Sequence, residues 1–180
     1  SGKTTMLRAA AGALKPYEGE VLFDRRPLKD YPPLELAQMR AVQEQKSELA
    51  FGFTCLYVVM MGRHPHPTSP PENVRLAKEA LDAVRMRSFS RRNYLNLSGG
   101  EQQRIHLARL YAQLQGEKAA LALLDEPTSA LDLVHQQEAL QLLRTLCTRG
   151  LAVAVVLHDL TLVAQYADDV VLMKDGRIEA

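Results

Sequence analysis

Hydrophobic positions along the chain alternate between two periods, one typical of buried strands and one typical of amphipathic helices. Residues 119–124 and 151–157 form continuous apolar runs, which indicate strands covered on both faces. The full set of expected elements comprises helices over 4–14, 34–40, 133–149 and 160–166 and strands over 19–24, 119–124, 151–157 and 170–173. Strands that alternate with helices in this way predict an α/β fold with a parallel sheet.

The middle third of the chain has a different pattern. Leu76, Ala80, Leu81 and Val84 follow helical spacing, and the proline-rich stretch 64–71 predicts a loop. We therefore expect a single domain over residues 1–180. Its core would comprise about 1–44 and 117–180, and a helical subdomain would be inserted at about 45–116.

Composition narrows the class of protein. The chain has 180 residues, of which 47% are hydrophobic and 24% charged, and a formal net charge of +1. These values are ordinary for a globular protein, and a charge so close to zero gives no field that attracts nucleic acid. A membrane-spanning helix needs about 20 consecutive apolar residues, and the longest apolar runs here are much shorter.

The chain opens with a phosphate-binding pattern. Ser1-Gly2-Lys3-Thr4-Thr5 matches the last part of the sequence GxxxxGK[ST]. Gly2 allows the backbone to approach phosphates closely, and the following helix N-terminus offers N–H donors and a positive dipole end. Lys3 would reach the β- and γ-phosphates, Thr4 would bind Mg²⁺, and Thr5 would contact the α-phosphate. A helix start without any ligand would produce the same five letters.

Two adjacent carboxylates end the first buried strand. Asp125 and Glu126 follow the apolar residues 119–124, and ligands of open α/β sheets bind beyond the carboxyl ends of strands. We expect Asp125 to hold Mg²⁺ and Glu126 to polarise the attacking water as a general base. On its own, the pair could also be a strand that leaves the core through a polar loop.

The most specific motif is the octapeptide Leu97-Ser98-Gly99-Gly100-Glu101-Gln102-Gln103-Arg104. Ser98 can cap the helix that begins there, and the two glycines leave its N-terminus open to an anion. This stretch resembles the signature motif of ATP-binding cassette (ABC) proteins. That resemblance extends over the whole chain, because the other motifs of the family follow in family order.

The resemblance implies a fold, cofactors and residue roles. The fold would be a RecA-like P-loop NTPase core with an inserted helical subdomain, and the cofactors would be ATP and Mg²⁺. Gln45 matches the Q-loop glutamine, which would bind Mg²⁺ and sense the γ-phosphate, and His158 matches the switch histidine. Two cassettes would sandwich ATP, with Ser98, Gly99 and Gly100 of one chain and its D-loop Asp132 facing the nucleotide of the other.

Some family features are absent or altered. The glycine-rich start of the phosphate loop and the aromatic residue that stacks on adenine do not precede Ser1. We interpret the sequence as incomplete at both ends, and we expect it to bind ATP weakly by itself. Gln43-Glu44 replaces the apolar-proline pair expected before the Q-loop glutamine.

The insert favours one subgroup of the family. Residues 51–54 and 58–66 resemble importers of iron chelates, cobalamin and haem, and residues 106–114 resemble haemin importers most. The expected activity is ATP hydrolysis that powers haemin import, with a ferric-siderophore or cobalamin importer as the alternative. A cassette ATPase acting on DNA or ribosomes is the alternative from another class.

An importer ATPase implies particular partners and a location. These are a second ATPase subunit, transmembrane permease subunits and, indirectly, a periplasmic substrate-binding protein, with no nucleic acid. The protein would then be peripheral, at the cytoplasmic face of the bacterial inner membrane.

Overall fold

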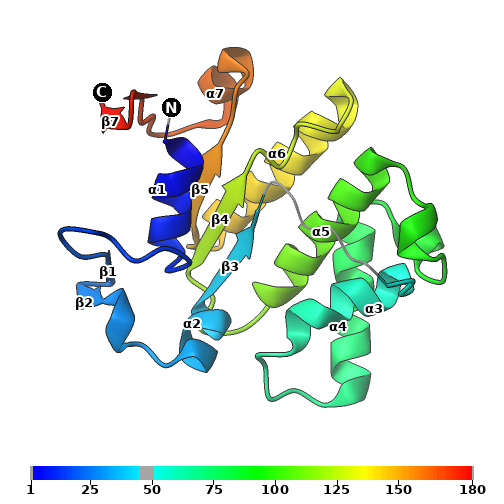
Figure 1. The fold of residues 1–180 in the computed structure, drawn as a ribbon. Helices are drawn as coiled ribbons and strands as arrows, with labels where there is room; N and C mark the ends of the chain where they lie inside the picture. The colour runs from blue at the N-terminus through cyan, green and yellow to red at the C-terminus, as the bar shows by residue number, and fades with distance from the viewer. Residues whose placement is uncertain (1, 45–50, 180) are drawn as a thin grey trace.

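A three-stranded parallel sheet lies at the centre of the computed structural model, which describes residues 2–44 and 51–179 (Figure 1). Its strands are β3 (Arg40–Gln43), β4 (Leu121–Asp125) and β5 (Ala152–Val156), in the order β3-β4-β5. Arg40 pairs with Leu121, and Leu121 pairs with Ala152. The predicted α/β fold with a parallel sheet is confirmed, although β3 was not among the expected strands.

The central strand β4 is buried on both faces, as its apolar run predicts. Leu123 packs with Leu7 of α1 (Lys3–Ala10) in one hydrophobic cluster. Ala122 and Leu124 face the other way, into the main core. The two faces alternate residue by residue because successive side chains of a strand point to opposite sides.

The second predicted strand, β5, is covered less completely than expected. Ala152 and Ala154 are exposed, whereas Val153 and Val155 pack partly against the main core. Among the described strands β5 lies at the edge of the sheet, so the expectation of burial on both faces is wrong. The adjacent helix α6 (Leu133–Thr148) contacts β5 and accounts for the covered side.

Helix boundaries follow local backbone signals. α6 is followed by Gly150 at φ 88°, a conformation that commonly ends a helix, and α7 (Leu160–Tyr166) has the expected bounds. α1 ends at Ala10 rather than at residue 14, because Gly12 adopts φ 69° and turns the chain. α2 (Pro33–Met39) begins with proline in its first turn, where the missing N–H costs nothing.

The expected strand over 19–24 is shorter in the structure. It reduces to β1 (Leu22–Phe23), which pairs with β2 (Arg26–Pro27) as an antiparallel hairpin. Asp24 and Arg25 both have positive φ, 47° and 63°, as the two central residues of a type I′ turn require. The 3-10 turn η1 (Leu28–Asp30) follows β2.

The expected strand over 170–173 is wrong for most of its length. Val170, Val171 and Leu172 are more than half exposed and lie outside the described strands. Pairing begins only at β6 (Met173–Lys174), which forms a hairpin with β7 (Arg177–Ile178). Asp175 and Gly176, both at positive φ, form the turn between these two strands.

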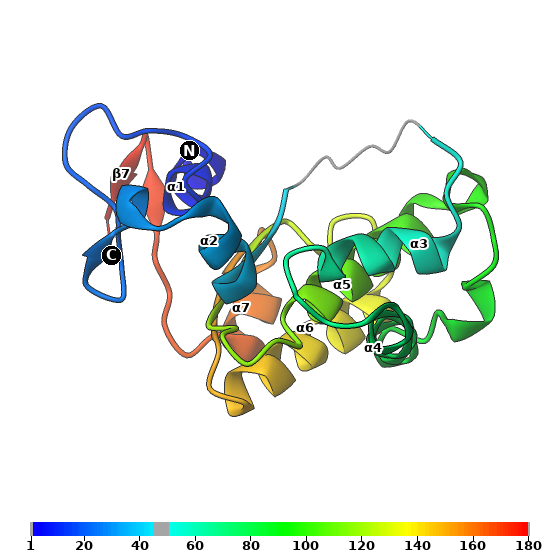
Figure 2. The same cartoon turned by 90° about the horizontal axis from the view of Figure 1, so that it is seen from below.

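Helices dominate the segment after residue 51, as expected. They are α3 (Cys55–Met60), α4 (Pro70–Ala83) and α5 (Gly99–Gln113), with the 3-10 turns η2 (Met61–Arg63), η3 (Arg87–Phe89) and η4 (Tyr94–Asn96). α3, α4 and α5 pack on one another and lie to one side of the sheet, away from α1 (Figure 2). None of the described helices is both long and apolar enough to span a bilayer.

Gly62 of η2 packs closely against the backbone of α5. A Cβ added there would lie 2.3 Å from the backbone oxygen of Arg109, so the two elements would have to separate. We expect Gly62→Ala to lower the free energy of unfolding by about 1–3 kcal/mol, the usual cost of overpacking.

Chemical denaturation of the two proteins measures this difference. The matched control is Gly19→Asn, because nothing lies within 4 Å of a Cβ at Gly19 and asparagine tolerates its φ of 77°. Equal stability of Gly62→Ala and the unmodified protein would contradict the close packing at this point.

Candidate functional site

The start of α1 has the geometry of an anion site. Gly2 precedes the helix at φ 89°, a conformation that favours glycine, and has no side chain to cap the first N–H groups. A Cβ on Gly2 would lie 3.1 Å from Cα of Gly176, so the β6–β7 turn leaves little room there. Lys3 opens the helix, and Thr4 and Thr5 are exposed in its first turn.

The carboxyl end of β4 and the start of α1 lie at the same end of the sheet (Figure 1). Asp125 is 1% exposed, and its Oδ1 atom has no hydrogen-bond partner among the described residues. A buried carboxylate oxygen without a partner is costly unless a cation or a donor satisfies it. Together with the Thr4 hydroxyl, this hard oxygen donor fits a magnesium ion and its waters.

Glu126 and His158 meet directly beyond the strand ends. Oε1 of Glu126 lies 2.5 Å from Nε2 of His158, which follows β5 after one residue. Glu126 adopts φ 51°, an uncommon conformation for a residue with a Cβ, and its N–H donates to the backbone oxygen of Val156. Adjacent parallel strands thus bring together two residues that are 32 positions apart.

A cavity of about 110 Å³ opens beside this pair. Its lining includes Glu126, Ser129, His158 and Asp159. The hydroxyl of Ser129 donates to the backbone oxygen of Glu126, which fixes the turn after β4. The side-chain amide of Gln136 donates to the backbone oxygens of Thr128 and Leu131 and holds the rest of the loop. These contacts hold the loop that directly follows Glu126.

The signature residues form the capped start of α5. The Ser98 hydroxyl accepts from the N–H of Glu101, and the Glu101 carboxylate accepts from the Ser98 N–H at 2.8 Å. This reciprocal capping box confirms the predicted cap. Hydrogen bonds from the Ser98 backbone and hydroxyl lower the pKa of Glu101 from its ordinary value, so its carboxylate is ionised at neutral pH.

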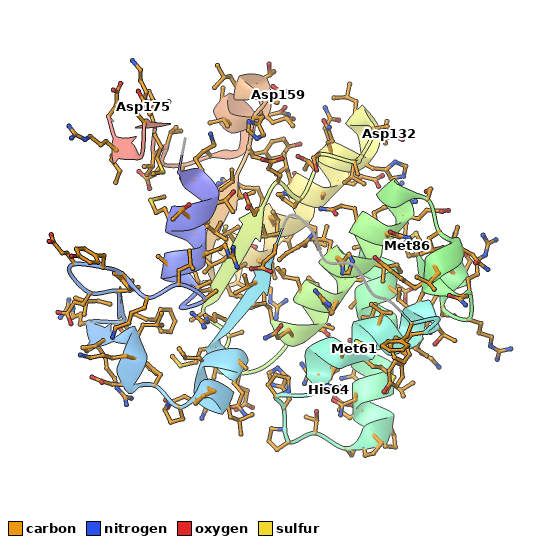
Figure 3. The ribbon with its side chains drawn as sticks, viewed as in Figure 1. Met61, His64, Met86, Asp132, Asp159 and Asp175 are labelled. Carbon is orange, nitrogen blue, oxygen red and sulfur yellow. The ribbon has the colours of Figure 1, made fainter. Side chains whose placement is uncertain are left out.

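Asp132 caps α6 close to the signature. Its Oδ1 accepts from the backbone N–H of His135 at 3.0 Å and lies 2.8 Å from Nδ1 of the same histidine. These two contacts lower the pKa of Asp132. Gly100 packs against the preceding loop, since an added Cβ would lie 3.0 Å from the Ala130 oxygen. Asp132 lies at the same end of the molecule as Asp159, and His64 lies at the opposite end (Figure 3).

The structure therefore sorts the predicted residues into two groups. Gly2, Lys3, Thr4 and Thr5 start α1, and Asp125, Glu126 and His158 follow the ends of β4 and β5. Ser98, Gly99, Gly100 and Asp132 form a second group at the starts of α5 and α6, apart from the start of α1 (Figure 1). The predicted Ser1 and Gln45 lie outside the described residues.

The sequence pattern did not indicate the roles of several residues that hold or surround the site. His135 and Gln136 hold Asp132 and the loop before it, and both belong to an ordinary amphipathic helix. Gln43, singled out as a departure from the family pattern, is 1% exposed, and neither polar atom of its amide has a described hydrogen-bond partner. The contacts of His135 and Gln136 are local, but the hydrophobic pattern of a helix does not show which of its polar side chains bond to the preceding loop.

Known proteins resemble this chain over nearly its whole length. A hemin import ATP-binding protein, HmuV, of Pseudomonas aeruginosa is 48% identical over 178 residues, covering 98% of this chain and 70% of the relative. HmuV of Gloeobacter violaceus is 44% identical and covers 99% of this chain and 66% of the relative.

Solved structures share the fold. The ATP-binding cassette MJ0796, a dimer bound to ADP and phosphate after hydrolysis, matches with a TM-score of 0.85 at 31% identity, covering 99% of this chain and 79% of that one. A transporter assigned to the metal-chelate type, in an inward-facing conformation, matches with a TM-score of 0.79 at 29% identity, covering 99% and 66%. The sequence profile described as "ABC transporter" matches residues 1–129, and the chain therefore belongs to the ABC transporter family.

Proposed function

We propose that this chain hydrolyses ATP, as one of two paired cassettes, to power haemin import through a membrane permease. The observation that carries the hydrolytic part is the contact between Glu126 and His158 beside the buried Asp125. The cargo is supported by 48% identity to a relative named as a hemin import ATP-binding protein. In this proposal the residues at the start of α1 and at the ends of β4 and β5 bind and hydrolyse ATP, and the residues at the starts of α5 and α6 contact the nucleotide of the partner subunit.

The start of α1 would bind the nucleotide phosphates. The first-turn N–H groups and Lys3 would hold the β- and γ-phosphates, with Ser1, Gly2 and Thr5 completing the contacts to the phosphate chain. Thr4, Asp125 and Gln45 would hold Mg²⁺, and the ion neutralises charge on the phosphates when bound. Asp125 suits this task because burial leaves its Oδ1 without a protein donor.

Glu126 and His158, which follow the ends of β4 and β5, would carry out hydrolysis. A water oxygen attacks the γ-phosphorus, the bond to the bridging oxygen of ADP breaks, and Glu126 takes the proton released from the water. His158, 2.5 Å from Glu126, orients that carboxylate and reaches the γ-phosphate. Gln45, the match to the Q-loop glutamine, would complete this set.

A second copy of the chain completes each site. Ser98, Gly99 and Gly100 lie at the start of a 15-residue helix, and such a helix start attracts an anion. Because this group lies apart from α1 within one chain, it serves the nucleotide of the partner subunit. Asp132, beside Gly100, faces the same interface. The similar cassette MJ0796 is a dimer, which supports this arrangement.

An aromatic surface on the helical side suits the permease. Phe51 is 70% exposed and Tyr57 is 46% exposed, and Phe53 lies between them with its ring stacked at 5.0 Å on Tyr57. Exposed apolar clusters of this kind mark protein contacts. The permease would place this ATPase at the cytoplasmic face of the bacterial inner membrane, with a periplasmic binding protein delivering cargo to the opposite side.

Replacing Glu126 tests the proposed general base. Glu126→Gln keeps the shape of the side chain and removes its basicity, so turnover in the assembled transporter should fall about 10²–10⁴-fold while ATP binding persists. Steady-state phosphate release and binding of a fluorescent ATP analogue measure the two quantities. Glu117→Gln, at an exposed position away from the site, is the control. Normal turnover in Glu126→Gln would exclude Glu126 as the base.

Polar substitution tests the aromatic surface. Phe51→Ser combined with Tyr57→Ser should lower transport and the recovery of the permease with the ATPase several-fold, because apolar contact area is lost. Co-purification with the permease measures assembly directly. Tyr17→Ser is the matched control, since Tyr17 is fully exposed on the core side. Equal recovery of all three proteins would place the permease contact elsewhere.

Uptake into vesicles tests the cargo. Vesicles containing the permease and this ATPase, loaded with ATP, should accumulate haemin and should not accumulate ferric siderophore or cobalamin. ATP-dependent accumulation of one of the other two compounds would replace haemin as the cargo and leave the ATPase assignment intact. Failure of all ATP hydrolysis would contradict the proposed activity itself.

A further inference from the structure

The C-terminal end of α5 is tied to the sheet side of the molecule by a set of side-chain hydrogen bonds. The amide Nε2 of Gln113 donates to the backbone oxygens of Ala37 at 2.8 Å and Arg40 at 3.0 Å. An amide nitrogen has two protons, so both bonds can form at once. Ala37 lies in the last turn of α2, where helix carbonyls lack intrahelical partners, and Arg40 begins β3.

The loop before α4 reinforces the same junction. Nε2 of His66 lies 2.8 Å from the backbone oxygen of Gln113, and Nη1 of Arg63 donates to the oxygen of Ala112 at 2.7 Å. Gln38 of α2 donates through its side chain to the backbone oxygen of Pro65 at 2.7 Å. The last carbonyls of α5 are thus satisfied by side chains rather than left to solvent.

Burial makes this junction stiff. Arg63 is only 2% exposed. A Cβ on Gly116 would lie 2.4 Å from Cε1 of His66, and one on Gly62 would lie 2.3 Å from the Arg109 oxygen, so neither neighbour leaves space for a side chain. Burial and the nearby charge of Arg63 lower the pKa of His66, which keeps its ring neutral at physiological pH. A neutral ring with its proton on Nε2 donates to the Gln113 oxygen.

The other end of the same helix carries the signature residues. The capping box joins Ser98 to Glu101, and the side chain of Gln102 donates to the backbone oxygens of Tyr94 and Leu97. The segment that leads into α5 is therefore fixed to the helix and moves with it. Any tilt of α5 at Gln113 is passed to Ser98 without local relaxation.

Length turns a small tilt into a large displacement. α5 has 15 residues, so it is about 22 Å long at about 1.5 Å per residue. A tilt of about 10° at Gln113 would move Ser98 by roughly 4 Å over that length. A misplacement of about 1 Å at a reacting group can already cost about 10²-fold in rate.

We infer that Gln113 is a positioning residue for ATP hydrolysis: its amide sets the angle of α5 against α2 and β3, and so the place of Ser98 and Gly100. This inference rests on the proposed function, in which those two residues bind the γ-phosphate held by the partner subunit. Gln113 itself touches no nucleotide, since it lies at the opposite end of α5 from the signature.

The test replaces Gln113 with methionine, which keeps the length of the side chain and removes both donors. In the assembled transporter, kcat per folded complex should fall about tenfold or more. ADP affinity should change less than about twofold, because ADP contacts only the phosphate loop of its own subunit. Gln141→Met, at an exposed position of α6, is the matched control. Unchanged kcat, or an equal loss of ADP affinity, would overturn the inference.

The distance between two spin labels tests the angle of α5 without measuring ATP hydrolysis. Spin labels at Leu95, beside the signature, and at Thr161 in α7 report the angle of α5 in a protein with Cys147 replaced by serine. Gln113→Met should broaden or shift the distance distribution by about 4 Å, the displacement expected from the helix length. Gln38→Met should have a smaller effect in the same direction.

An unchanged distribution in both variants would overturn the positioning role. A shifted distribution in a transporter that hydrolyses no ATP even when unmodified would contradict the proposed function and leave the role of Gln113 in setting the angle of α5 in place.

Discussion

β4 is covered on both of its faces, and this burial determines where its last residues can lie. Leu123 packs toward α1, and Ala122 and Leu124 pack into the main core, so the strand cannot slip or rotate without exposing one of these faces. Asp125 is consequently held beneath the surface, and Glu126 emerges at the strand end to meet His158 from β5. The same packing keeps α1 beside the sheet, because Leu7 of α1 and Leu123 of β4 belong to one cluster.

A second long element links the two functional groups of residues. α5 carries the signature at its first turn and is bonded to α2 and β3 at its last. Gly100 also packs against the loop that leads to Asp132, so the signature and that aspartate form one continuous surface, which we propose faces a partner subunit. In the proposed dimer, binding of ATP would depend on the distance between the signature and the ends of β4 and β5 within each subunit. The hydrogen bonds of Gln113 hold α5 at one end, and the packing of β4 and β5 holds the residues at the strand ends.

The sequence was most informative where chemistry requires particular residues at fixed spacing. The start of α1, the strand ending in Asp125 and the Ser98 cap were all predictable, because each depends on neighbours within a few positions. β3 was missed because only four residues, ending in Gln43, form it, and its burial comes from β4 and α5. The expected strand at 170–173 was wrong because an apolar run alone does not provide a neighbouring strand. The hydrogen bonds of Gln113 to Ala37 and Arg40 join segments that are distant in the sequence, and no local pattern could indicate them.

A structure of the assembled transporter with a non-hydrolysable ATP analogue tests the central claim most directly. The γ-phosphate should lie about 3 Å from Lys3 Nζ of one subunit and from the signature serine or glycine of the other, while Glu126 faces the water behind it. A complex in which ATP is fully bound and the signature of the second copy contacts no phosphate would contradict the division of work between the two groups of residues.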